Sequence, residues 1–269
     1  MSNDQVPQFR VDRAQVQICS SLRELGLAGA ARAARLIRRA IDARGRARII
    51  VATGNSQFPL VEALVQQPVN WQAVEVFHMD EYVGISADHP SSFRYWIRTR
   101  LEERVRPAKT FYIEGDATNL DAEIERYSHL LLEAPIEVAF VGFGENGHIA
   151  FNDPHVADFN DPAILKEITL DPASRAQQAG EGHFKDVASV PQRAITITCP
   201  GLFRAGSWIC CVPETRKAVA VRQALEGPIS EACPASLVRK HPDAVVYLDR
   251  DSASLLSSAG SGMQAGQPA

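Results

Sequence analysis

Two carboxylates stand side by side in this sequence, Asp80 and Glu81, directly after an apolar alternating run over 73–78. That run is typical of a buried strand, and in an open α/β sheet ligands bind beyond the carboxyl ends of the strands. Carboxylates at such a position can hold a metal ion, accept a proton or cap a following helix. The pair therefore marks a candidate functional site, and the rest of the sequence bears on which role applies.

A glycine-rich turn, Gly142–Pro154, follows another predicted strand and carries a histidine. His148 can exchange protons near neutral pH, and its polar neighbours include Asn146 and Asp153. Glycines such as Gly147 let the backbone approach a small ligand closely. We therefore predict that this turn contributes to a ligand site, with a purely structural histidine as the alternative.

The spacing Gly142-x-Gly144-x-x-Gly147 matches the dinucleotide-binding fingerprint, with Glu167 at the expected later position. A dinucleotide site also requires a long helix directly after the glycines, whereas Pro154 follows the turn closely. A metal site built from the histidine and the nearby carboxylates lacks the H-x-x-x-H and H-E-x-x-H spacings of common metal motifs. The sequence therefore predicts neither a nicotinamide cofactor nor a metal.

Two further segments have the residue types of an anion site. Thr53, Gly54, Asn55, Ser56 and Gln57 lie between a predicted strand and a predicted helix, where backbone N–H groups can cradle an anion. Lys217 lies in the first turn of a predicted helix, where the helix dipole disfavours a cation unless it helps to bind an anionic ligand. An ordinary turn and a surface lysine beside Arg216 are the alternatives.

Strand and helix patterns alternate along most of the chain, which predicts one α/β domain over residues 1–256. We expect a single doubly wound, mostly parallel sheet with helices on both faces, a Rossmann-like three-layer sandwich. Predicted strands cover 47–52, 73–78, 111–113, 138–141, 194–198, 207–212 and 244–248, with a short edge strand near residues 9–18. Predicted helices cover 25–44, 59–65, 91–100, 121–132 and 215–225. Segment 155–190 loses strong periodicity, which suits a lid or an active-site excursion, and residues 257–269 are expected to form a disordered tail.

Composition narrows the class of protein. The net charge of −4 comes with interspersed charges and no basic stripe, so nucleic acid is not an expected partner. No run approaches the ~18 apolar residues of a membrane helix, and residues 1–20 do not read as a signal peptide. We expect a cytoplasmic protein. The five cysteines lack C-x-x-C spacing and are predicted to be buried free thiols.

Taken together, these segments resemble the glucosamine-6-phosphate deaminase family, also called the glucosamine/galactosamine-6-phosphate isomerases. The resemblance rests on four segments, Phe77–Gly84, His89–Phe93, Gly144–Pro154 and Lys217–Ser230. Related 6-phosphogluconolactonases share the fold and a Gly-His turn, but typically have arginine where this chain has Tyr82.

The resemblance implies a cofactor-free hydrolase that converts glucosamine 6-phosphate and water to fructose 6-phosphate and ammonia. Asp80 would be the base that moves a proton from C2 to C1 through a cis-enediol, and His148 with Asn146 and Asp153 would assist ring opening. The substrate would be bound by Thr53, Gly54, Asn55, Ser56, Gln57, Lys217, Glu81 and Gly147, with Glu81 in a supporting role. A sugar phosphate is the expected partner, and the oligomeric state stays open, a homo-oligomer included.

Several positions depart from the family pattern. Asn146 replaces an aspartate, Asp153 replaces a glutamate, and the loop at 53–57 differs from the common Gly-Gly-Thr-Pro or Gly-Ser-Thr-Pro form. Segment 155–190 has no clear counterpart of the family's substrate-binding arginine, although Arg175 or Lys185 could substitute. The basic residues of the family's allosteric site are also absent after the turn, so we expect no activation by N-acetylglucosamine 6-phosphate.

These departures keep two other functions open. One is an enzyme of the same fold that acts on galactosamine 6-phosphate or on a phosphogluconolactone, although Tyr82 argues against the lactone. The other is a sugar-phosphate sensor without turnover. Such sensors usually carry a DNA-binding domain, and residues 1–25 are too short to form one.

Overall fold

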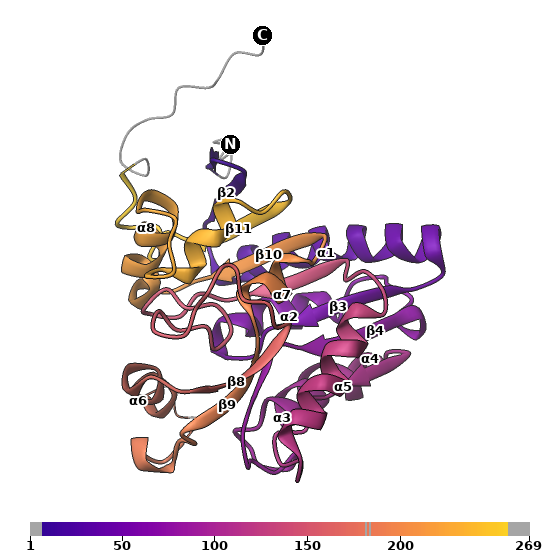
Figure 1. The fold of residues 1–269 in the computed structure, drawn as a ribbon. Coiled ribbons are helices and arrows are strands. Elements are labelled where there is room, and N and C mark those ends of the chain that lie inside the picture. Colours follow the sequence, from indigo (N-terminus) through magenta and orange to yellow (C-terminus); the bar gives the residue numbers. More distant parts are fainter. Residues whose placement is uncertain (1–6, 181, 183, 258–269) are drawn as a thin grey trace.

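A computed structural model of the protein describes residues 7–257 except 181 and 183. Its main sheet has eight strands in the order β1-β2-β11-β10-β7-β3-β4-β6 (Figure 1). Every neighbouring pair is parallel except the amino-terminal hairpin β1–β2. The strands are β1 (Gln8–Val11), β2 (Ala14–Cys19), β3 (Ala47–Val51), β4 (Val74–His78), β6 (Lys109–Phe111), β7 (Val138–Val141), β10 (Ser207–Val212) and β11 (Ala244–Asp249).

Helices cover both faces of this sheet. They are α1 (Leu22–Arg44), α2 (Phe58–Leu64), α3 (Phe93–Ile97), α4 (Glu103–Val105), α5 (Leu120–Leu132), α6 (Pro172–Gly180), α7 (Cys199–Phe203) and α8 (Ala218–Glu226). Short single-turn segments include η1 (Asn55–Gln57), η2 (Trp71–Ala73), η4 (Val187–Ser189), η5 (Thr215–Lys217) and η6 (Pro234–Arg239), and α3 continues into the π-helical η3 (Arg98–Glu102).

Two apolar cores lie on opposite sides of the sheet, because successive side chains of a strand point to opposite faces. In β3, Ile49 packs with Leu25 of α1 and Leu60 of α2. The next residue, Ile50, packs in the other core with Tyr127 of α5. The predicted α/β fold with a mostly parallel sheet and helices on both faces is therefore confirmed.

A second, three-stranded antiparallel sheet was not predicted. It has the order β5-β9-β8 and consists of β5 (Asp80–Tyr82), β9 (Arg193–Ile197) and β8 (Leu165–Thr169). The alternating pattern identified β9 as a strand, but it cannot tell which sheet a strand joins. Together with α6 (Pro172–Gly180), β8 gives part of segment 155–190 a regular structure that its weak periodicity does not predict. Figure 1 shows α6, β8 and β9 extending from one side of the main sheet.

Other differences concern element boundaries. The predicted amino-terminal edge strand is a hairpin of two strands, β1 and β2. Ser257, the first residue of the predicted tail, donates its backbone N–H to Glu226 at 2.7 Å, and residues 258–269 lie outside the described part. The five cysteines are free and buried, as predicted. Among the helices of the described residues, none is long and apolar enough to cross a membrane.

Candidate active site

One cavity gathers most of the predicted site residues at the carboxyl ends of β3, β4, β7 and β10. Its lining includes seven of them, namely Thr53, Gly54, Asn55, Ser56, Asp80, His148 and Lys217. The chain brings these residues together because parallel strands present their carboxyl ends at the same edge of the sheet. The five others, Gln57, Glu81, Asn146, Gly147 and Asp153, are not part of the cavity lining.

The loop 53–57 forms one end of the cavity. Gly54 has a φ of 118°, a backbone conformation that other residues rarely adopt, and η1 follows directly. Gln57 is fully buried and ties the loop to β10, since its Nε2 donates to the carbonyl of Cys211 at 3.2 Å. A side chain at Gly142 would meet Gln57 Nε2 at 3.1 Å, so glycine there lets β7 and the loop approach closely.

Asp80 begins β5 and is only 5% exposed although it lines the cavity. Burial, together with the neighbouring Glu81 carboxylate, raises the pKa of Asp80 well above its usual value. A carboxylate in such surroundings is a stronger base than one in water, which suits proton abstraction from carbon.

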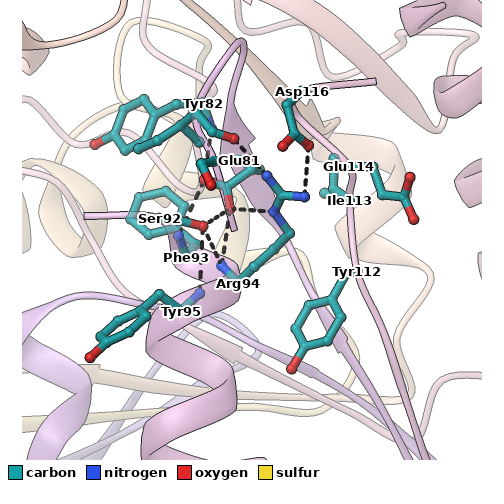
Figure 2. A network of polar contacts seen from close by, with 12 residues as sticks. Glu81, Tyr82, Ser92, Phe93, Arg94, Tyr95, Tyr112, Ile113, Glu114 and Asp116 are labelled. Carbon is teal, nitrogen blue, oxygen red and sulfur yellow. Dashed lines mark hydrogen bonds and ion pairs between the residues drawn. The ribbon is translucent and has the colours of Figure 1, made fainter. Parts of the chain in front are cut away.

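Glu81 does not line the cavity, because adjacent residues of β5 point to opposite faces. Its fully buried carboxylate accepts hydrogen bonds from the backbone N–H groups of Phe93 (3.2 Å) and Arg94 (3.0 Å) and from Ser92 Oγ (2.6 Å). Arg94 Nε lies 3.4 Å away, and the same guanidinium pairs with Asp116 at 2.8 Å (Figure 2). Glu81 therefore fixes the start of α3 from outside the cavity lining.

Burial raises the pKa of Glu81 above its usual value, although the hydrogen bonds from Ser92, Arg94, Phe93 and Tyr82 act in the opposite direction. The result is a pair of adjacent buried carboxylates that disfavour each other's ionisation. Because Glu81 is held by several donors and a nearby guanidinium, its charge is the better compensated of the two. Asp80 is left as the carboxylate that faces the ligand.

His148 is oriented by two oxygen atoms. Its Nδ1 lies 2.8 Å from Asn146 Oδ1 and 3.0 Å from Asp153 Oδ1. An amide oxygen can only accept, so Nδ1 carries the proton and donates it, and Nε2 is the ring atom that can take up another proton. A side chain at Gly144 would lie 2.2 Å from the imidazole, so this glycine makes room for the ring. The arrangement supports a histidine that exchanges protons with a ligand.

Asp153 supports this histidine from a fully buried position. Its Oδ1 also accepts from Asn146 Nδ2 at 2.8 Å and from Ser174 Oγ at 2.5 Å. Burial alone would raise the pKa of Asp153, but the hydrogen bonds from His148, Asn146 and Ser174 outweigh it and lower the pKa to about 2. Asp153 is therefore ionised at neutral pH. Ser174 was not singled out in the sequence, because α6 was not predicted.

Gly147 acts through its backbone. It has a φ of 82°, and a side chain there would lie 2.7 Å from Cys233 Sγ. Substitution would strain the turn that carries His148. The structure thus supports a conformational role for this glycine behind the cavity wall.

The cavity also contains residues that the sequence did not single out as ligand contacts. They include Phe93 and Phe151 on its apolar side, Gln177 and Gln178 of α6, and Arg216 next to Lys217. Gln178 Oε1 accepts from the hydroxyl of Tyr82 at 2.8 Å, which fixes the orientation of that amide. Of these residues, Arg216 could have been identified from the sequence, because it is a second cation next to Lys217.

Neither basic residue suggested for segment 155–190 lines the cavity. Arg175 Nη2 donates to the carbonyls of Val187 (2.7 Å) and Val190 (2.9 Å), which braces the chain after α6. Lys185 is exposed. The cations of the cavity lining come instead from η5. In the described part of the chain, no group of three or more His, Cys, Asp or Glu side chains has a geometry that could hold a metal ion.

Comparisons with known proteins identify the family of this chain. The family of glucosamine-6-phosphate isomerases/6-phosphogluconolactonase matches residues 20–247. A glucosamine-6-phosphate deaminase of Listeria innocua is 33% identical over 230 residues, which cover 86% of this chain and 96% of the relative. A Bacillus thuringiensis protein of the same name is 30% identical over 225 residues, 84% of each chain.

Two solved structures are similar over most of their length. A monomeric glucosamine-6-phosphate deaminase has a TM-score of 0.81 at 31% identity, over 89% of this chain and 99% of that one. A 6-phosphogluconolactonase of Shewanella baltica, at 19% identity and a TM-score of 0.73 over 87% and 96% of the two chains, shares the fold. The family match and the identities confirm the resemblance: the chain belongs to the glucosamine-6-phosphate isomerase/6-phosphogluconolactonase family.

Proposed function

We propose that the protein is an isomerising deaminase that converts glucosamine 6-phosphate and water to fructose 6-phosphate and ammonia. The observation that carries this proposal is the placement of one buried carboxylate, Asp80, and one oriented imidazole, His148, in the same cavity as Lys217 and Arg216. A base, a proton-exchanging ring and two cations are what an aldose-to-ketose conversion of a phosphorylated sugar requires. The deaminases of similar sequence support the same assignment.

The first chemical step is the opening of the sugar ring. The Nε2 atom of neutral His148 would take the proton of the C1 hydroxyl and pass it to the ring oxygen as the C1–O bond breaks. The ionised Asp153 carboxylate stabilises the imidazolium that forms in between, because it accepts the Nδ1 proton at 3.0 Å. Asn146 contributes orientation, since its Oδ1 accepts from the same ring nitrogen.

The second step moves a proton between neighbouring carbons. Asp80 would remove the C2 proton of the open-chain sugar and return it to C1, through a cis-enediol-type intermediate that carries the amino group at C2. Protonation at C1 leaves an imine at C2. Water adds across this C=N bond, and the resulting carbinolamine loses ammonia as the C2 ketone forms. One carboxylate can serve both carbons because they are a single bond apart, and Phe93 and Phe151 give part of the cavity wall an apolar surface.

The phosphate would bind at the end of the cavity that is lined by the loop 53–57 and Lys217. Lys217 is almost fully buried, at 3% exposed, yet it lines the cavity, so an anion bound there would lie beside its charge. The loop 53–57 adds hydroxyl and backbone donors. Arg216, from the same turn as Lys217, takes the place of the arginine that segment 155–190 does not supply.

The test is ammonia release from glucosamine 6-phosphate, followed with a coupled dehydrogenase. Wild type should be active, Asp80→Asn should lose at least about a thousandfold in kcat because it lacks the base, and Asp88→Asn should retain full activity. Asp88 is the matched control since its side chain is 84% exposed and lies outside the cavity lining. Absence of ammonia with every amino-sugar phosphate at high enzyme concentration would refute the proposal.

Two alternatives make different predictions in the same assays. A substrate panel with galactosamine 6-phosphate and 6-phosphogluconolactone separates enzymes of this fold, and the solved 6-phosphogluconolactonases of similar fold keep the lactone in that panel. A sensor would bind glucosamine 6-phosphate without exchange of its C2 proton in deuterated water. Deuterium incorporation at C1 of fructose 6-phosphate, or at C2 of recovered substrate, therefore favours the enzyme.

A further inference from the structure

His78 lies directly behind the candidate base. It is the last residue of β4, is fully buried and does not line the cavity. The chain leaves the eight-stranded sheet at this residue and enters the three-stranded sheet at Asp80, with Met79 as the connection. The carbonyl of Met79 accepts from the backbone N–H of Ile197 at 2.8 Å, so the crossing point is tied to β9.

The imidazole of His78 bridges two backbone groups. Its Nε2 accepts the backbone N–H of Ile113 at 2.9 Å, and its Nδ1 lies 2.9 Å from the carbonyl oxygen of Asp80. A backbone N–H can only donate and a carbonyl can only accept, so the proton resides on Nδ1 and the ring is neutral. Burial lowers the pKa of His78 to about 3, in agreement with a neutral ring.

The backbone of His78 is held as firmly as its ring. The hydroxyl of Tyr127 donates to the carbonyl of His78 at 2.8 Å and accepts from its N–H at 3.0 Å. Among the described residues β5 pairs with β9 alone, which makes it an edge strand of its sheet. On the open side of β5, the His78 ring thus supplies the hydrogen-bond donor that a neighbouring strand would otherwise offer to the Asp80 carbonyl.

We propose that His78 is a positioning residue for Asp80, whose Nδ1–H bond to the Asp80 carbonyl fixes where the carboxylate stands in the cavity. This inference rests on the proposed function, in which one carboxylate serves two neighbouring carbons. A base with that task tolerates little displacement, since a shift of about 1 Å can cost about a hundredfold in rate. The strand β5 pairs with β9 and is held at Glu81, and the His78 ring adds a hydrogen bond at the Asp80 backbone itself.

Two substitutions of His78 test the contacts of its two ring nitrogens separately. In His78→Asn the amide nitrogen can occupy the place of Nδ1 and keep the donor to Asp80, whereas the acceptor for Ile113 is lost. In His78→Gln the longer amide can reach the place of Nε2 and keep the acceptor for Ile113, whereas the donor to Asp80 is lost. Each variant leaves one buried backbone group unsatisfied, so both should lower the melting temperature by similar amounts.

Ammonia release should distinguish them. We expect kcat of His78→Asn within about fivefold of wild type and kcat of His78→Gln lower by about a hundredfold, with KM for glucosamine 6-phosphate nearly unchanged in both. Equal losses in the two variants, or a loss in KM instead of kcat, would overturn the inference. An inactive wild type would count against the proposed function instead.

A readout that needs no activity completes the test. In crystal structures of the same variants, the Asp80 carboxylate should be displaced in His78→Gln and unmoved in His78→Asn; an unmoved Asp80 in His78→Gln overturns the inference whatever the substrate. Should His78→Gln not fold, Tyr127→Phe provides the milder variant, because it removes the hydroxyl that holds His78. Its kcat should fall about fivefold at constant KM, and an unchanged kcat would contradict the proposed role.

Discussion

Asn146 bridges His148 and Asp153. The Oδ1 atom of Asn146 lies 2.8 Å from His148 Nδ1, and its Nδ2 donates to Asp153 Oδ1 at 2.8 Å. Asp153 also reaches the histidine itself, at 3.0 Å. The neutral amide at position 146 therefore does not leave the imidazole without an anionic partner. The short side chain of Asp153 suffices because Ser174 and Asn146 hold its carboxylate against the ring.

Asp153→Asn should destabilise the protein at neutral pH by about 2 kcal/mol, the free energy that corresponds to its lowered pKa. A depressed pKa in the folded state stabilises the fold above the unfolded pKa near 4, and this contribution is lost as the pH falls toward about 2. Urea denaturation should show that the difference in unfolding free energy between Asp153→Asn and wild type is smaller at the lowest pH where the protein folds than at pH 7. A difference independent of pH would contradict it. Asp42→Asn, at an exposed position of α1, serves as the control.

Asp80→Asn should have the opposite effect on stability. The pKa of Asp80 is raised in the folded state, so between the unfolded pKa and the raised value the folded protein binds more protons than the unfolded chain. Wild-type stability therefore falls as the pH rises through this interval, and the neutral amide avoids that loss. Melting temperatures should show Asp80→Asn above wild type at pH 8 and close to it at pH 4.5. A variant less stable than wild type at pH 8 would contradict the raised pKa.

The pH dependence of wild-type activity should reflect the raised pKa of Asp80. Because Asp80 must be ionised to act as a base, kcat/KM should decrease as the pH falls through the pKa of this carboxyl group. The acid limb should lie above the usual pKa of an aspartate, since burial and Glu81 raise it. A profile of kcat/KM against pH with no decline above pH 4 would argue against Asp80 as the base.

Arg94→Met should be among the most destabilising substitutions near the site. It leaves the Glu81 carboxylate fully buried beside Asp80 without its cation, which costs about 3 kcal/mol for a buried pair of this kind. The double variant Glu81→Gln/Arg94→Met should recover part of the loss, because the amide carries no charge. Urea denaturation of the two variants and of Glu81→Gln gives the coupling energy. A double variant less stable than Arg94→Met would contradict the role of this pair (Figure 2).

The sequence predicted the main sheet and the carboxyl-end location of the site because both follow from local patterns. Buried parallel strands read as apolar runs, and glycines with polar residues after them mark the strand ends. The sequence indicates Asp80 as a carboxylate after a strand, His148 through its glycine-rich turn and Lys217 as a cation at a helix start, although the three are far apart in the chain.

The remainder depends on contacts that a local pattern does not contain. β5 has only three residues and directly follows β4, so its membership of a second sheet depends on pairing with β9. The supporting contacts of Ser174 and Gln178 come from α6, whose apolar positions are too few to predict a helix. Glu81 and Asp80 look equivalent in the sequence, and only the alternation of side chains in β5 separates the helix-capping carboxylate from the ligand-facing one.

Lys217 and Arg216 should govern affinity for the phosphate group. Both line the cavity from one turn, and Arg216 is oriented by Glu214 at 2.5 Å and Glu145 at 3.2 Å. Charge-assisted bonds to phosphate form equally in the bound substrate and in the transition state, so their loss should raise KM more than it lowers kcat. We expect Arg216→Gln to raise KM by about tenfold and Lys217→Met by about a hundredfold.

The control for this pair is Arg222→Gln, which removes an exposed cation of α8 at the same change in net charge. Its KM should equal that of wild type, because long-range attraction is screened at physiological salt. Inorganic phosphate should inhibit wild type competitively and Arg216→Gln more weakly. The contrary result is that Arg216→Gln leaves both KM and phosphate inhibition unchanged while Lys217→Met alters them. That result would show that Arg216 pairs with Glu214 and Glu145 without contacting the ligand. The inhibition constants separate these cases, since they report the anion site without any catalytic step.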